Sequence, residues 1–109
     1  EARTTADAEF FYHGRLALAT VYKKDYKYLD GRGELVLNLL GQIKGVEYIV
    51  LLKEQKPEQI GISIRSRRKP IDAIAVALGG GGHERAAGAI VRDNMENVRR
   101  RILELFKGE

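Results

Sequence analysis

The sequence contains no cysteine and no tryptophan, and it has only two prolines and two histidines. The absence of cysteine excludes disulfide bonds and zinc sites built from thiolates. No run of about 18 or more apolar residues occurs, so the sequence predicts no membrane-spanning helix and no membrane partner. The segment from Glu1 lacks the pattern of a signal peptide. We therefore expect a cytoplasmic location.

The composition is that of one globular domain with a basic surface. The chain has 109 residues, of which 44% are hydrophobic and 31% are charged, and its net charge is +4. Such a basic balance favours nucleic acids, nucleotides or acidic lipid heads as partners. Arg99–Arg101 are interpreted as a solvated helix face, because successive helical residues point about 100° apart. Four other basic residues crowd one five-residue stretch: Arg65, Arg67, Arg68 and Lys69.

The first 14 residues are weakly patterned and differ from the rest of the chain. Residues 6–11 are interpreted as the end of a helix, so residues 1–14 are expected to be the tail of a linker or helix from an upstream domain. Residues 15–109 then form a single domain. The chain has no initiator methionine, which favours an excised domain or a proteolytic product.

Hydrophobic periodicity predicts a mixed α/β domain with the element order β-α-β-β-α-β-α. The expected architecture is a small sheet of about four strands with flanking helices. Strands are predicted at residues 15–22, 46–52, 59–65 and 86–91, and helices at 35–44, 70–78 and 93–106. Asp93 and Glu96 have capping-box spacing at the start of the last helix.

Residues 59–65 alternate strictly between two kinds of side chain. Three isoleucines point to one side, and Gly61, Ser63 and Arg65 point to the other. The second side has two small residues before an arginine. This arrangement leaves room for a ligand beside the guanidinium of Arg65, which offers planar bidentate donors to a phosphate.

Four consecutive glycines, Gly79–Gly82, precede His83. Such a run indicates positive φ angles or a very close approach of the backbone to another group. One interpretation is a flexible linker, or a helix C-cap followed by a tight turn. The other is an anion site built from bare amides, which the basic strand end favours. The predicted phosphate-binding residues are Arg65, Ser66, Gly80, Gly81, Gly82, His83 and, more weakly, Arg85.

No catalytic set is recognisable in the sequence. Only His13 and His83 are available as imidazole ligands or bases, and no acidic pair has a familiar metal spacing. Ser63 or Ser66 beside His83 is conceivable as a nucleophile, but the Gly-x-Ser-x-Gly pattern is missing. We expect no catalytic and no metal-binding residue in this chain.

Several of these segments together resemble the DHH-associated domain of DHH-family phosphoesterases. The resemblance is carried by Ile62–Ser66, by Ile71 and Asp72 opening a helix, by Gly79–His83, and by Ala86–Gly88. It covers about residues 15–107, nearly the whole chain. The glycine-histidine motif with its following Ala-Ala-Gly is its most specific part.

The most similar members are oligoribonuclease/pAp phosphatases and the cyclic di-AMP or pApA phosphodiesterases. The resemblance implies that Arg65, Ser66, Gly80–Gly82 and His83 bind the nucleotide and phosphate of a substrate. It further implies hydrolysis of phosphodiester bonds in short 5′-phosphorylated RNA or DNA, such as nanoRNA, pApA or pAp. Two metal ions, typically manganese, would be held by an upstream DHH domain. The Asp-His-His motif is absent here, so this chain alone is expected to be inactive.

Two non-catalytic readings remain open at this point. Related glycine-rich domains end alanyl-tRNA synthetases and contact tRNA, although the histidine after the glycines is not expected there. A stand-alone nucleic-acid-binding module would instead use the basic residues 65–69. Its affinity would fall steeply with salt and grow with strand length.

Overall fold

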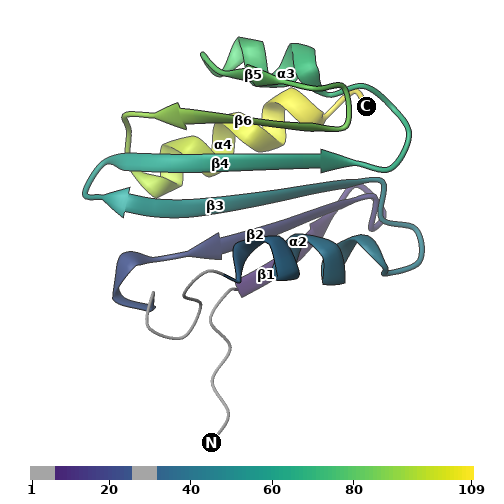
Figure 1. Cartoon of the computed structure of the whole chain (residues 1–109), viewed down its shortest axis with the longest axis horizontal. Helices are drawn as coiled ribbons and strands as arrows, with labels where there is room; N and C mark the ends of the chain where they lie inside the picture. The colour runs from purple at the N-terminus through teal and green to yellow at the C-terminus, as the bar shows by residue number, and fades with distance from the viewer. Residues whose placement is uncertain (1–6, 26–31) are drawn as a thin grey trace, which may run out of the picture.

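The computed structural model describes residues 7–25 and 32–109. Its centre is a six-stranded sheet in the order β1-β2-β3-β4-β6-β5 (Figure 1). Strands β2 and β3 are parallel, and every other neighbouring pair is antiparallel. The strands are β1 (Asp7–Phe11), β2 (Leu16–Val21), β3 (Tyr48–Lys56), β4 (Gln59–Ser66), β5 (Gly81–Gly82) and β6 (Ala86–Val91). The helices are α2 (Gly33–Gly41), α3 (Asp72–Ala77), α4 (Met95–Phe106) and the short 3-10 helix η1 (Lys23–Asp25).

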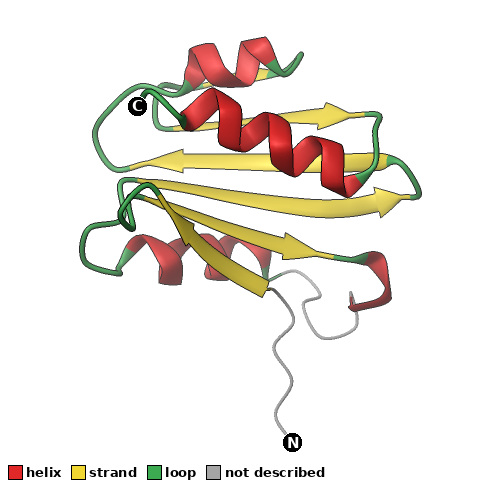
Figure 2. Cartoon of the chain, turned by 180° about the vertical axis from the view of Figure 1, so that it is seen from behind, coloured by secondary structure: helices red, strands yellow, loops and turns green. Residues whose placement is uncertain are grey.

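Helices cover the two faces of the sheet unequally. Helix α4 lies behind the sheet in Figure 1 and in front of it in Figure 2, whereas α2 lies on the opposite face. The larger core joins α3 and α4 to alternate residues of β2, β3, β4 and β6, and includes Ile64, Ile102 and Phe106. A smaller core joins α2 to β2 and β3 through Leu37, Ile49 and other apolar residues.

The face of the sheet that carries α2 is covered only over part of its width. In β4 the isoleucines are buried in the α3/α4 core, while Gly61, Ser63 and Arg65 face the other way and are half-buried. In Figure 1 no described helix lies in front of β4 and β6. Ile90, which pairs with Gly61, is 59% exposed on this bare side. The α/β class is as the sequence predicted, and the alternation identified the open face.

The sheet has two strands more than the expected four, one at each edge. Residues 6–11 were predicted as the end of a helix, and this is wrong for Asp7–Phe11, which pair with β2 as strand β1. Antiparallel pairing with β2, the next segment of the chain, determines this strand, and Phe11 packs against the larger core. Residues 1–6 lie outside the described residues, and the domain boundary at residue 14 stays a prediction.

Some element ends also differ from the expectations. Strand β3 continues to Lys56, so the connection to β4 is shorter than predicted. Helix α2 ends at Gly41 rather than at Lys44. The N-cap of α4 is Asn94, whose side chain accepts a hydrogen bond from the Asn97 amide, and not Asp93. Asp93 instead accepts from the Asn94 amide and the Asn97 side chain, which a capping-box spacing does not reveal.

Candidate functional site

A surface pocket of about 540 Å³ lies where β4 ends beside α2. Three of the predicted site residues line it together: Arg65, Ser66 and Arg85. Arg67 also contributes to this pocket, and the α2 side supplies apolar and amide-bearing residues. We call this the first pocket; its remaining lining residues are Leu37, Asn38, Gly41, Gln42 and Ile49.

Arg65 is held at the edge of the first pocket by two contacts. Its Nη2 donates to Glu34 Oε1 at 3.0 Å, and its Nη1 donates to the carbonyl of Ile64 at 3.0 Å. The Arg65 side chain is 29% exposed and that of Glu34 is 63% exposed, so water screens this ion pair. The guanidinium is therefore oriented by the protein while its outer edge stays accessible to an anion.

Ser66 acts first as a structural residue of the loop after β4. Its hydroxyl donates to the carbonyl of Lys69, and its amide donates to the carbonyl of Arg85 at 3.0 Å. The hydroxyl proton is thus already used, and donation to a phosphate requires the Lys69 contact to break. The amide contact ties the end of β4 to the turn that carries Arg85.

The glycine run has two different structural roles. A Cβ at Gly80 would lie 2.0 Å from the carbonyl oxygen of Gly88, and a Cβ at Gly82 would lie 2.6 Å from Ala87 Cα. These two glycines are required because β5 packs closely on β6. Gly81 is not constrained in this way. Its φ lies outside the left-handed region, and an added Cβ would meet nothing within 4 Å.

The amides of the run are also unequal. The Gly80 amide donates to the carbonyl of Ala75 at 2.8 Å and closes the end of α3. The His83 amide donates to the carbonyl of Ala86 at 2.8 Å in the turn between β5 and β6. Both donors are therefore engaged within the protein, so the loop does not present a row of bare amides.

The register of the sheet nevertheless aligns the predicted residues on the bare face. Arg65 pairs with Ala86, whose carbonyl accepts the His83 amide, so Arg65 and His83 end the same cross-strand row. Two strand spacings separate them, roughly 10 Å. The next row on the same face of the sheet consists of Ser63, Gly88 and Gly81, all small. His83 and Arg85 are exposed.

The sheet thus brings the arginine, the histidine and the glycine strand to one face, but the first pocket itself does not include the glycines or His83. Sequence reasoning assigned no site role to Gly88 or Glu34. Gly88 was visible as part of the Ala-Ala-Gly signature. The Glu34 contact joins residues 31 positions apart, and no local pattern signals it.

No metal site is evident in the described part of the chain. Residues 7–25 and 32–109 contain no group of three His, Cys, Asp or Glu side chains placed to hold an ion. In the same ranges, no helix has the length and apolar character that crossing a membrane requires. Burial raises the pKa of the Tyr48 hydroxyl above its usual 10.0, and this group belongs to the core rather than to the open face.

Comparison with known proteins identifies the family and the fold of this chain. The sequence matches the DHHA1 domain family over residues 18–108. No curated protein matches it. The fold is similar to that of an exopolyphosphatase-related protein from Bacteroides fragilis, with a TM-score of 0.83 and 26% identity, covering 94% of this chain and 31% of that one.

Two more distant structures share the fold. A pGpG-specific phosphodiesterase from Vibrio cholerae has a TM-score of 0.59 at 16% identity, covering 93% of this chain and 34% of its own. An uncharacterized protein from Helicobacter pylori has a TM-score of 0.54 at 18% identity, covering 96% and 29%. The chain thus spans about one third of these proteins. The resemblance to the DHH-associated domain is confirmed, and this chain belongs to the DHHA1 domain family of DHH-type phosphoesterases.

Proposed function

We propose that this domain binds the terminal phosphate and the adjoining nucleotide of a short oligonucleotide or dinucleotide for a DHH-type phosphodiesterase. The substrates we favour are 5′-phosphorylated RNA or DNA fragments such as nanoRNA, pApA and pAp. The observation that carries the proposal is the bare face of β4, β6 and β5, which ends in Arg65 and His83 on one cross-strand row.

Charge supports a phosphate at this end of the face. Arg65, Arg67 and Arg85 line one pocket, and a guanidinium presents paired donors that match phosphate oxygens. Glu34 opposes an anion, but its carboxylate is 63% exposed and already paired with Arg65. His83, which is exposed, adds an imidazole N–H donor.

Shape supports a nucleotide beside that phosphate. The row of Ser63, Gly88 and Gly81 carries no bulky side chain, so a flat group can approach the sheet closely. Gly81 is the key position, because nothing in the fold requires a glycine there. A bound ligand would supply the reason for its small size.

Hydrolysis itself is proposed to belong to a DHH domain outside this chain. The described residues do not fit a manganese centre, since no three ligating side chains converge. Two manganese ions, a metal-activated water and the exonuclease activity are therefore attributed to that upstream domain, and this chain alone is expected to be inactive. A cytoplasmic location is part of the same proposal.

Calorimetric titration with 5′-phosphorylated diadenylate, without metal, tests the site. We expect Arg65→Ala and His83→Ala each to weaken binding, Arg65→Ala by roughly tenfold or more, because a hydrogen bond to a charged group is worth about 1.5–3 kcal/mol. Lys56→Ala, an exposed lysine at the opposite end of β4's hairpin, is the charge-matched control.

Two further titrations separate the alternatives. Diadenylate without its 5′-phosphate should bind more weakly to the wild type and about equally to wild type and Arg65→Ala. Unchanged affinity for the phosphorylated ligand in both Arg65→Ala and His83→Ala would overturn the assignment. Affinity that depends only on strand length and salt would favour a general nucleic-acid-binding module instead.

A further inference from the structure

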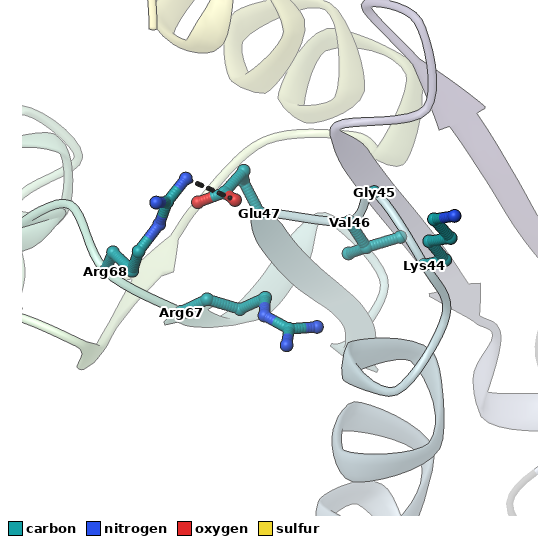
Figure 3. A pocket seen from close by; sticks show the side chains of 6 residues that line it. All are labelled: Lys44, Gly45, Val46, Glu47, Arg67 and Arg68. Atoms are coloured by element: carbon teal, nitrogen blue, oxygen red, sulfur yellow. Dashed lines mark hydrogen bonds and ion pairs between the residues drawn. The ribbon is translucent and has the colours of Figure 1, made fainter.

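A second pocket, of about 470 Å³, adjoins the first (Figure 3). It lies between the turn after α2 and the loop after β4, and its lining residues are Lys44, Gly45, Val46, Glu47, Arg67 and Arg68. Arg67 lines both pockets, so the two are contiguous across its side chain. Neither the glycine run nor His83 contributes to the second pocket.

Three cations and one carboxylate line the second pocket, which leaves it with an excess of positive charge. Glu47 Oε2 accepts from Arg68 Nη2 at 3.0 Å, the contact drawn in Figure 3. The Glu47 side chain is 20% exposed, whereas that of Arg68 is 76% exposed. The carboxylate is therefore set back and the guanidinium projects outward, where it meets a ligand first.

The ion pair with Arg68 uses only one of the two carboxylate oxygens of Glu47. Its other oxygen, Oε1, is buried and accepts no hydrogen bond from the described residues. Repulsion of an anion by Glu47 is reduced because Arg68 already neutralises it. The same ion pair orients the Arg68 side chain at the pocket. Binding of an anion then costs less side-chain conformational entropy.

Arg67 is fixed at the junction of the two pockets. Its amide donates to the carbonyl of Glu47 at 3.0 Å, and its Nη1 donates to the carbonyl of Gly41 at 2.8 Å at the end of α2. Figure 3 shows its side chain extended toward that helix end, away from Arg68. Arg67, which lines both pockets, is thus held in place by the end of α2.

We propose that the second pocket is a phosphate subsite for the following part of the oligonucleotide whose terminal phosphate occupies the first pocket. The inference rests on the proposed function and narrows it: the domain favours single strands longer than a dinucleotide. Arg65 and Arg68 are three residues apart, at most about 11 Å along the chain, so one flexible strand can reach both pockets. Lys44 and Arg68 are the cations that line the second pocket and not the first.

Titration of the chain with two ligands tests this subsite, a 5′-phosphorylated diadenylate and a 5′-phosphorylated pentaadenylate. The wild type should bind the pentamer more tightly. The double variant Lys44→Ala/Arg68→Ala should lose at least about fivefold in affinity for the pentamer and keep its affinity for the dimer. Its salt dependence with the pentamer should flatten by about 0.7 in log–log slope for each phosphate contact removed.

The matched control is Lys56→Ala/Arg92→Ala, which removes the same charge from exposed positions at the opposite end of β4 and β6. It should leave the difference between pentamer and dimer intact. A wild type that binds both ligands equally, or a control that loses the pentamer as strongly as Lys44→Ala/Arg68→Ala, would overturn the subsite. Failure of the dimer to respond to Arg65→Ala would instead contradict the proposed function of the first pocket.

Discussion

The two faces of strand β4 have opposite character although they are built from alternating residues of one segment. On one face Ile60, Ile62 and Ile64 are at most 3% exposed beneath α3 and α4. On the other face Gly61, Ser63 and Arg65 are half-buried, no described helix lies in front of β4 in Figure 1, and Arg65 meets α2 only at its edge, through Glu34. The first face is covered by the protein itself, whereas the second carries small and polar side chains and ends in the charged Arg65.

This difference separates the face that stabilises the fold from the face on which we propose that a ligand binds. The covered face buries large apolar side chains, which is the dominant favourable term in folding. The bare face contributes little burial, so its residues are free to serve a ligand. Substitutions on the two faces should therefore separate loss of stability from loss of affinity.

The largest expected effect is a loss of stability on the covered face. Ile64→Ala should lower the free energy of unfolding by about 2–5 kcal/mol, because it removes a fully buried side chain and leaves a cavity. Urea unfolding followed by circular dichroism measures this change. Ser63→Ala, one residue away on the bare face, is the control and should change stability by well under half that amount.

Gly80 and Gly81 offer a similar comparison between a tightly packed position and an open one. Gly80→Ala should destabilise the domain strongly, since its Cβ would lie 2.0 Å from the Gly88 carbonyl oxygen. Gly81→Ala should leave the unfolding midpoint unchanged or slightly raised, because it meets no atom and loses less chain entropy on folding.

Binding should show a different order. Gly81→Ala is expected to weaken diadenylate binding severalfold by placing a methyl group on the open face, measured by calorimetry on the stably folded variant. A Gly81→Ala variant that binds as well as the wild type would show that no ligand approaches the sheet at this row. A Gly80→Ala variant of normal stability would contradict the close packing of β5 on β6.

The smallest expected effect concerns pH and the helix that covers the packed face. Hydrogen bonds from the Asn97 side chain and the Asn94 amide lower the pKa of Asp93 below its usual 3.8. A carboxyl whose folded pKa is lowered contributes stability above the unfolded pKa and loses it as pH falls through the folded value. Stability should therefore decline slightly more below about pH 4 in the wild type than in Asp93→Asn.

Thermal unfolding between pH 6 and pH 2 measures that difference, and Asp72→Asn, an acidic residue in the first turn of α3, is a matched control. Identical acid profiles of wild type and Asp93→Asn would rule out a role of Asp93 at the start of α4. Binding of diadenylate at pH 7 should be unaffected by either substitution.

Much of this architecture was predictable because local patterns determine it. The strict alternation of residues 59–65 predicted both the strand and its two faces, and β4 spans Gln59–Ser66. The apolar spacing in the last helix likewise placed Val98, Ile102 and Phe106 in the core. Periodicity is informative wherever one side of an element is buried.

The remaining features depend on pairing between segments, which the periodicity of one segment alone does not show. Strand β1 exists because it pairs with β2, and β5 exists because Gly80 and Gly82 allow close contact with β6. The sequence could show that the glycines are needed but not whether a ligand or a neighbouring strand requires them. The second pocket, likewise, joins the turn after α2 to the loop after β4, which no local pattern relates.

The two-residue strand β5 forms one edge of the sheet. Long exposed edge strands offer unpaired amides and carbonyls on which another chain can add a strand, a common route to aggregation. An edge strand of only two residues offers another chain few backbone groups to pair with. At this edge the domain can therefore keep an open sheet face for the proposed ligand while offering little template for strand addition, whereas the five-residue strand β1 at the other edge offers more.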